Sequence, residues 1–307
     1  MGVVYRADHA LLKRPTAVKL LLPSRSGDVA AARFEREVQL TAKLIHPNTV
    51  TIFDYGHTPD GYFYYAMEYL DGADLEQLVN ATGPLHPARV IHLLAQAAAG
   101  LAEAHEIGLI HRDIKPANIL VASAPPVADL VKVVDFGLVR ELEGTGETLT
   151  RTDTLVGTPL YLAPEAITAP EDVDVRIDIY ALGAVGYFLL TAEHVFTGST
   201  IVEICSHHLH TAPIPPSERV HATIPDMLEE VLLDCLSKDP ADRPQSAGAL
   251  RDLLLACQEH ASWEQEQARQ WWAEHGAQVI ESRERFSLDE VAPTILRDPD
   301  PPSRRRD

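Results

Sequence analysis

The first part of the chain follows the two-residue alternation of β-strands, interrupted once by a helical pattern. Short β-branched and apolar runs are bounded by turn residues such as Lys13-Arg14-Pro15 and Pro59-Asp60-Gly61, which predicts hairpins between neighbouring strands. Residues 28–44 instead place apolar side chains at four-residue spacing, as an amphipathic helix does. The strands are expected at residues 2–8, 16–22, 49–55 and 62–67. Residues 1–70 therefore predict a small lobe with an antiparallel sheet and one main helix.

After Asp71-Gly72 the pattern changes to helices. Pro87 stands at a helix start, an apolar stripe follows it, and Gly108 ends the stripe, in keeping with the preference for proline at the first position of a helix and glycine past the last. Further helices are predicted at residues 173–191, 226–237 and 246–257. The larger part of the chain is thus expected to be a mostly helical lobe, which makes the whole an α+β protein.

Beyond Cys257 a Glu-, Gln- and Ala-rich stretch precedes an end rich in Pro, Asp and Arg. We expect residues 258–307 to form a helical and then a disordered tail. Trp263 and Trp271 are spaced so that both could lie on one helical face. That face would dock on the large lobe or on a partner, and docking on the parent chain is the favoured alternative.

Composition narrows the class of protein. The 307 residues are 46% hydrophobic, enough for a sizeable core. The net charge of −19 repels phosphate backbones, so nucleic acid is not expected as a partner. No segment reaches the roughly 18 apolar residues of a membrane span, and the first residues do not resemble a secretion signal. The three widely spaced cysteines favour neither a disulfide framework nor a zinc site. We therefore expect a cytoplasmic protein.

Candidate chemistry concentrates in three segments. His111-Arg112-Asp113-Ile114-Lys115-Pro116-Ala117-Asn118 gathers an acid, a cation and an amide in an apolar frame. Asp135 follows an apolar strand and precedes Phe136-Gly137, so a second carboxylate emerges at a strand end. Lys19 lies among apolar neighbours in a strand, where a buried cation needs an anion or a paired carboxylate.

In these motifs the chain resembles the eukaryotic-like serine/threonine protein kinases of bacteria. The resemblance runs from residue 2 to about residue 256, and the motifs occur in the family's order: the strand lysine, HRDxKxxN, DFG, Ala163-Pro164-Glu165 and a late arginine, Arg243. It implies a two-lobed kinase fold over residues 1–257, with an N-lobe of residues 1–70 and a C-lobe of residues 71–257. It also implies ATP and Mg²⁺ as cofactors and protein Ser or Thr hydroxyls as acceptors.

The resemblance also implies a role for each motif residue. Asp113 would accept the proton of the substrate hydroxyl, and Lys115 would neutralise the moving phosphoryl group. Asn118 and Asp135 would hold Mg²⁺, which prefers oxygen ligands. Lys19 would bind the ATP phosphates while pairing with a helix carboxylate. The family's register assigns that carboxylate to Glu37, and Glu35 is the alternative, roughly 200° away around the helix.

The nucleotide base needs a flat apolar slot with backbone hydrogen bonds along one edge. By resemblance, Val4, Ala17 and Leu120 enclose the adenine and Met67 closes the back of the slot. Glu68, Tyr69 and Leu70 would form the hinge between the lobes. Asp74 matches the acidic position that contacts ribose or a basic substrate residue. Without the resemblance, Val4, Ala17 and Leu120 are equally well explained as ordinary core residues.

Regulation is expected in the loop between Asp135 and Glu165. Arg112, beside Asp113, can pair with a phosphate on that loop. We expect autophosphorylation there, at Thr150 or Thr152, with Thr154 as a further candidate; self-association of two copies could serve this reaction. The alternative is that the loop is hydroxyl-rich only because it is polar.

Two further residues are expected to have structural roles. Glu165 is expected to pair with Arg243, and Asp178 is expected to anchor the catalytic loop.

The chain departs from the family at its beginning. Of the glycine-rich loop GxGxxG followed by Val and Tyr, only Gly2-Val3-Val4-Tyr5 is present, so the first strand and part of the phosphate-covering loop are missing from this sequence. We expect a start codon upstream of Met1; the alternative is a shortened kinase. The runner-up function is a pseudokinase or docking module with weak or no catalysis, and a small-molecule phosphotransferase is a third possibility.

Two further features lie outside the motifs. Residues 122–129 form a proline-containing insertion, which we interpret as a surface extension of a hairpin. His207, His208 and His210 could bind a metal ion, but no fourth ligand is evident. A solvated helix or loop is the preferred interpretation of this histidine cluster.

Overall fold

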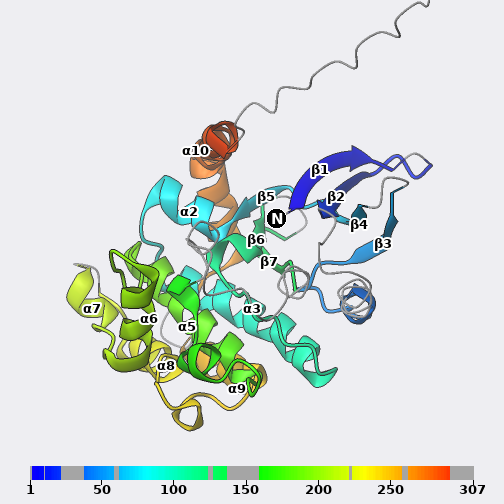
Figure 1. Ribbon diagram of the computed structural model, residues 1–307. Coiled ribbons are helices and arrows are strands. Elements are labelled where there is room, and N and C mark those ends of the chain that lie inside the picture. Colours follow the sequence, from blue (N-terminus) through cyan, green and yellow to red (C-terminus); the bar gives the residue numbers. More distant parts are fainter. Residues whose placement is uncertain are drawn as a thin grey trace, which may run out of the picture.

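The computed structural model describes residues 2–9, 11–21, 38–58, 62–123, 127–136, 159–220, 223–257 and 262–290. Figure 1 shows a small strand-rich lobe beside a larger helical one, as expected from the change of pattern near Gly72. In the described part of the chain, no helix is long and apolar enough to cross a membrane.

The small lobe is a four-stranded antiparallel sheet with the strand order β1-β2-β4-β3. The predicted hairpins are confirmed, with shifts of one to three residues at strand ends. The strands are β1 (Gly2–Asp8), β2 (Pro15–Leu21), β3 (Ile52–His57) and β4 (Phe63–Glu68). Of the helix predicted at residues 28–44, residues 38–41 are helical, and residues 28–37 lie outside the described part.

A second, three-stranded sheet joins the two lobes. Its strands are β5 (Gly72–Asp74), β6 (Ile119–Ala122) and β7 (Leu130–Val133), paired antiparallel in that order. Thr49 forms an isolated parallel bridge to Val133, and Asn48 Nδ2 donates a hydrogen bond to the Val131 carbonyl oxygen at 2.8 Å. These contacts fix the segment before β3 to the sheet that carries the candidate catalytic residues.

The large lobe is built around α5 (Arg176–Thr191), nearly all of whose residues are buried. Gly183 and Gly186 permit close packing on this helix, because a Cβ at either position would lie about 2.4–2.5 Å from side chains of α8. The remaining helices are α2 (Leu75–Thr82), α3 (Pro87–Glu106), α4 (Pro164–Thr168), α6 (Ile201–His210), α7 (Pro216–Arg219), α8 (Asp226–Cys235) and α9 (Ala247–Cys257), with 3₁₀ turns η1 (Pro116–Asn118), η2 (Pro159–Tyr161) and η3 (Pro240–Asp242). The helices predicted for this lobe are thus confirmed, with starts one to three residues later for α5 and α9.

A long helix, α10 (Gln265–Glu290), packs on α2 and β5. Figure 1 shows it beside α2, at the end of the large lobe that faces the strands. Docking on the parent chain is confirmed, but the predicted shared helical face of Trp263 and Trp271 is wrong, since Trp263 precedes the helix. Trp272, which lies on the buried side of α10, is the most enclosed of the three tryptophans.

The interpretation of residues 122–129 as a surface extension is wrong for the last two of these residues. Asp129 is fully buried, and Ala128 is almost so. The Asp129 carboxylate forms a bidentate ion pair with Arg89 of α3, at 2.8 Å for each contact. It also accepts the indole N–H groups of Trp263 and Trp272, at 2.9 and 2.7 Å. Asp129 is therefore an internal anchor that joins α3 to the segment of Trp263 and α10. We call Asp129, Arg89, Trp263 and Trp272 the Asp129 cluster.

The histidine cluster was predicted to lie on a solvated helix or loop, and this prediction is wrong for His208. His208 is fully buried on α6, and its Nδ1 lies 2.8 Å from the hydroxyl of Tyr180. Burial lowers the pKa of His208 to about 3, so the ring is neutral near neutral pH. Within the described residues, no group of three or more His, Cys, Asp or Glu side chains could hold a metal ion.

Candidate active site

Two polar side chains of the HRDxKxxN segment, Lys115 and Asn118, converge on the carboxylate of Asp113. Lys115 Nζ lies 2.8 Å from Asp113 Oδ2, and Asn118 Nδ2 donates to the same oxygen at 3.0 Å and to the Asp113 carbonyl at 2.8 Å. The turn η1 begins at Pro116 and brings Asn118 back toward Asp113. The Asp113 side chain is therefore held in one orientation, and it is still about one-third exposed, so it is open to a molecule from solvent.

A buried carboxylate of α5 fixes the backbone of this loop. Asp178 accepts the backbone N–H of His111 at 2.8 Å and that of Arg112 at 2.9 Å, and its Oδ2 lies 2.9 Å from His105 Nε2. Arg112 has a φ of +65°, a left-handed conformation that costs a non-glycine residue free energy and persists only where its surroundings impose it. The predicted anchoring role of Asp178 is confirmed.

His111 links the catalytic loop to the segment that carries Asp135. Its Nε2 lies 2.8 Å from the Val134 carbonyl oxygen, and its Nδ1 lies 3.3 Å from the Asp113 backbone N–H. Since a carbonyl only accepts, Nε2 carries the proton and Nδ1 is the acceptor. The ring also packs on Phe136, with 4.7 Å between ring centroids. Val134 N–H in turn donates to the Asn118 carbonyl at 3.0 Å, so Asn118 and Asp135 lie close together.

Asp135 is bound by two residues of the small lobe. Lys19 Nζ lies 2.7 Å from its Oδ2, and the hydroxyl of Tyr65 donates to its Oδ1 at 2.6 Å. Burial alone would raise the pKa of Asp135, but the charge of Lys19 and the hydrogen bonds from Lys19 and Tyr65 outweigh it, and the pKa is lowered. The carboxylate is therefore ionised, and its φ of +62° marks a second imposed backbone conformation.

The strand register explains how these residues meet. In β2, Ala17, Lys19 and Leu21 alternate onto the buried face, because successive side chains of a strand point to opposite sides. Residues opposite each other on paired strands share a face, and Lys19 is opposite Tyr65. The alternation that buries the apolar residues of β2 and β4 thus also points Lys19 and Tyr65 at Asp135.

The residues expected around the nucleotide base lie at the junction of the lobes. Ala17 and Met67 belong to the core of the small lobe, and Tyr69 and Leu120 pack against it. Val4 is opposite Lys19 on β1 and is half-exposed. A cavity beside the hinge is lined by Leu70, Gly72, Ala73, Asp74, Gln77 and Leu120.

The hinge residue Glu68 and the nearby Asp74 have structural contacts that the sequence did not indicate. Glu68 Oε1 accepts the ammonium of Lys132 at 2.7 Å and the Thr51 N–H at 2.8 Å, which ties the hinge to β7. The carboxylate of Asp74 caps α2 by accepting the Gln77 N–H at 2.8 Å, and the Gln77 side chain reciprocates. A contact of Asp74 with ribose or substrate remains a prediction.

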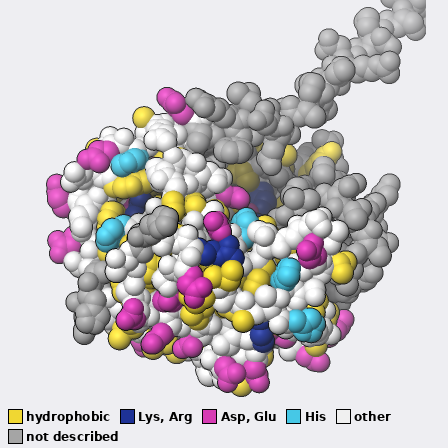
Figure 2. All heavy atoms as spheres, turned by 90° about the vertical axis from the view of Figure 1, so that its left-hand side faces the viewer, with side chains coloured by type: hydrophobic (Ala, Val, Ile, Leu, Met, Phe, Trp, Pro, Cys, Tyr) yellow, Lys and Arg dark blue, Asp and Glu magenta, His cyan; other side chains and the backbone are white. Residues whose placement is uncertain are grey.

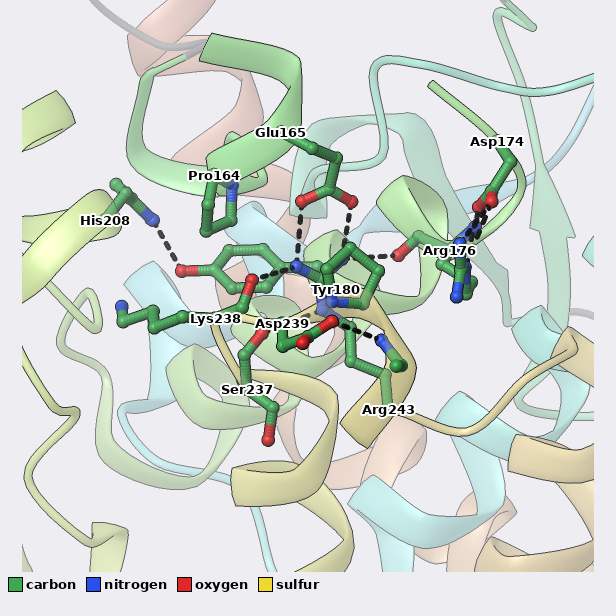
Figure 3. Close-up of polar contacts among 12 residues, drawn as sticks. Pro164, Glu165, Asp174, Arg176, Tyr180, His208, Ser237, Lys238, Asp239 and Arg243 are labelled. Atoms are coloured by element: carbon green, nitrogen blue, oxygen red, sulfur yellow. Dashed lines mark hydrogen bonds and ion pairs between the residues drawn. The ribbon is translucent and has the colours of Figure 1, made fainter. Parts of the chain in front are cut away.

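Below the catalytic loop, Glu165 and Arg243 form the predicted ion pair. Figure 3 shows the two oxygens of Glu165 facing the Arg243 guanidinium, with the Tyr180 ring alongside. The contacts are 2.6 and 2.8 Å, and Arg243 also donates to the backbone carbonyls of Ser237, Lys238 and Arg176. Arg243 thereby joins α4, which begins at Pro164, to the core of the large lobe.

Several predicted residues lie outside the described part of the chain. These are Glu37 and its alternative Glu35, Gly137 and the candidate phosphorylation sites Thr150, Thr152 and Thr154. Gly2 is described only as the first residue of β1. The roles proposed for these residues stay predictions.

Tyr65 is the site residue that sequence reasoning missed. A tyrosine in an apolar alternating strand is typical of a core residue, and nothing near it in the sequence indicates a hydroxyl partner. The only signal in the sequence is the position of Tyr65 two residues before Met67, which places both side chains on the same face of the strand.

Comparisons with known proteins agree with this geometry. Residues 1–255 match the family model described as protein kinase domain. The chain is 38% identical over 260 residues to serine/threonine-protein kinase pkn3 of Myxococcus xanthus, covering 83% of this chain and 47% of that protein. It is 40% identical over 263 residues to serine/threonine-protein kinase PknB of Mycolicibacterium smegmatis, covering 84% and 41%. The chain thus spans less than half the length of these curated relatives.

Two solved structures share the fold. The kinase domain of PknI from Mycobacterium tuberculosis has a TM-score of 0.64 and 29% identity, and the match covers 83% of this chain and 90% of that one. Rad53 in complex with AMP-PNP has a TM-score of 0.67 and 26% identity, with 82% and 62% covered. With the family model matching most of the sequence, the chain belongs to the protein kinase family.

Proposed function

We propose that this chain is a serine/threonine protein kinase, which transfers the γ-phosphoryl group of ATP, with Mg²⁺, to Ser or Thr hydroxyls of proteins. The observation that carries the proposal is the joint placement of Asp113 and Asp135. Asp113 is oriented by Lys115 and Asn118, and Asp135 is held ionised by Lys19. The named kinase relatives support the same activity.

The residues present suit the chemistry of phosphoryl transfer, in which catalysis is chiefly positioning and electrostatics. Asp113 accepts the hydroxyl proton and aims the oxygen at the phosphorus, while Lys115, 2.8 Å away, balances the charge of the moving group. Lys19, whose ammonium lies 2.7 Å from the Asp135 carboxylate, holds the ATP phosphates.

Asp135 and Asn118 would hold the magnesium ion. A carboxylate and an amide supply the hard oxygen donors that Mg²⁺ prefers, and Mg²⁺ in such sites takes one or two carboxylates together with substrate phosphates and water. The donor set at this position therefore fits the ion. When bound, Mg²⁺ neutralises charge on the phosphates.

Protein substrates with basic segments fit the charge of the chain. The net charge is −19, and Figure 2 shows Asp and Glu side chains spread over the face of the large lobe that it presents. An acidic surface attracts cationic segments at long range and repels polyanions.

Regulation by autophosphorylation is part of the proposal. Arg112 is adjacent to Asp113 and lies in the wall of a cavity with Tyr161 and Ala163, which brings it near the end of the loop that holds Thr150 and Thr152. Mass spectrometry of protein incubated with and without ATP should show phosphate on this loop. A loop that stays unmodified while a protein substrate is phosphorylated would remove this regulation from the proposal and leave the transfer activity.

A transfer assay tests the main function. With γ-labelled ATP, Mg²⁺ and a basic protein substrate, we expect label on Ser and Thr. Asp113→Asn should lower the rate by about 10²–10⁴-fold, the usual contribution of a general base, without changing nucleotide binding. A wild-type chain that binds nucleotide but labels no protein would point to a pseudokinase, and label on metabolites alone would point to a small-molecule phosphotransferase.

A further inference from the structure

We propose that Tyr65 is a positioning residue for Asp135, and that its hydroxyl orients this carboxylate for Mg²⁺. The inference rests on the proposed function, because that function assigns the ion to Asp135. Tyr65 lies on β4 of the small lobe, 70 residues from Asp135 in the sequence, and it would not itself touch the ion.

The geometry points to orientation of the carboxylate. The Tyr65 hydroxyl donates to Oδ1 at 2.6 Å, and Lys19 binds Oδ2 at 2.7 Å, so each oxygen has its own donor. Tyr65 is 1% exposed, and the ring is fixed among apolar neighbours of the small-lobe core. Lys19 has a long flexible stem, whereas the phenol is a rigid donor that defines the plane of the carboxylate.

This hydrogen bond leaves Asp135 able to bind a cation. Each carboxylate oxygen has two lone pairs, so Oδ1 can accept the Tyr65 hydroxyl and still face a metal ion. Hydrogen bonds to metal-binding carboxylates fix their orientation, and their loss typically weakens metal binding 10- to 100-fold. The bond from Tyr65 has the short length of a charge-assisted hydrogen bond to an ionised acceptor.

The competing explanation is that Tyr65 only fills the core. Phe63 and Met67 occupy the neighbouring positions of the same strand face, and neither side chain has a hydroxyl. If packing were the whole role, phenylalanine would serve equally well. Tyr65→Phe therefore separates the two explanations, because it keeps the ring and removes only the hydroxyl.

The test measures metal binding directly. Mn²⁺ replaces Mg²⁺, AMP-PNP is the nucleotide, and electron paramagnetic resonance reports free Mn²⁺ in a titration. For Tyr65→Phe we expect Mn²⁺ affinity to fall about 10-fold, with AMP-PNP binding in EDTA unchanged and the Mg²⁺ concentration for half-maximal velocity raised by a similar factor. Tyr64→Phe, next to it on the other face of β4 and half-buried, is the matched control and should behave as the wild type.

The outcomes are distinct. A change below 2-fold in Mn²⁺ affinity for Tyr65→Phe overturns the positioning role, as does an equal loss of AMP-PNP binding with and without metal. A wild-type chain that binds no Mn²⁺ with AMP-PNP overturns the proposed function and this role together. Should Tyr65→Phe fail to fold, 3-fluorotyrosine at position 65 keeps the hydroxyl. Its ¹⁹F resonance should then shift when Mg²⁺ is added to the AMP-PNP complex, and an unmoved resonance overturns the role.

Discussion

Replacing Asp129 by asparagine should strongly destabilise the protein, although no catalytic role is predicted for this residue. Asp129 is 0% and Arg89 1% exposed at the side chain, and the carboxylate accepts four hydrogen bonds, two from Arg89 and one each from Trp263 and Trp272. Asparagine has nearly the same shape, but it is neutral and offers a single acceptor oxygen. Arg89 would remain buried without a counter-charge.

The magnitude follows from the burial of the pair. Removing one partner of a buried ion pair costs about 3–5 kcal/mol, since the other charge stays desolvated, and unsatisfied N–H groups add to this cost. For a domain of this size, about 3–5 kcal/mol lowers the melting temperature by roughly 10 °C. The cation–π contact of Arg89 with Trp271, 3.6 Å from the ring centroid, offsets only part of the loss, because an aromatic face is a weaker partner than a carboxylate.

Thermal and urea unfolding of Asp129→Asn test this reasoning. The matched control is Asp252→Asn, which breaks an ion pair with Arg251 on an exposed helix surface where the aspartate is 66% exposed; exposed pairs contribute about 0–1 kcal/mol. A melting temperature within 2 °C of the wild type for Asp129→Asn would refute the buried-charge argument. Replacing both members, as in Arg89→Met with Asp129→Leu, should cost less than Asp129→Asn alone, because no charge is then stranded.

Three further predictions concern the rest of the molecule. Glu165→Gln should lower the free energy of unfolding by about 3 kcal/mol or more, since Arg243 is 0% exposed at the side chain; urea unfolding measures this, and a loss below 1 kcal/mol contradicts it. The pKa of His208 is lowered from 6.5 to about 3 by burial. Between pH 6.5 and pH 3, His208 is therefore protonated in the unfolded chain and neutral in the folded chain. Stability should therefore fall as the pH drops from 6.5 toward 3, by about 1.4 kcal/mol per pH unit for this group. His208→Gln should make the free energy of unfolding depend less steeply on pH. An unchanged dependence would contradict the lowered pKa of His208. Glu37→Gln should lower phosphoryl transfer far more than Glu35→Gln in the labelled-ATP assay, and comparable losses would show that the assumed helix register is wrong.

The sequence predicts well those features that depend on residues close together along the chain. The alternation in β2 and the four-residue spacing in the helices follow from backbone geometry, so the strands and helices appear close to their expected positions. The motif residues Asp113, Lys115 and Asn118 lie within one short loop, and their contacts with each other need no long-range information.

The missed features depend on contacts between distant segments. Asp129 follows a proline-containing stretch typical of a surface turn, and its indole partners lie 134 and 143 residues later. Arg89 stands in an apolar helix, where a charged residue usually extends to solvent. Neither residue's neighbours in the sequence reveal that a charge of opposite sign is buried against it. Register in β4 places Tyr65 on the buried face, but only the fold brings Asp135 to it.

The strand β7 connects the Asp129 cluster to the candidate chemistry. Asp129 immediately precedes β7, and Asp135 follows it after Val134. Lys132 within the strand binds the hinge residue Glu68. The strand is paired with β6 along its whole length. Trp272 of α10 and Trp263, just before that helix, thus hold the residue that leads through β7 to Asp135, the carboxylate that Lys19 binds.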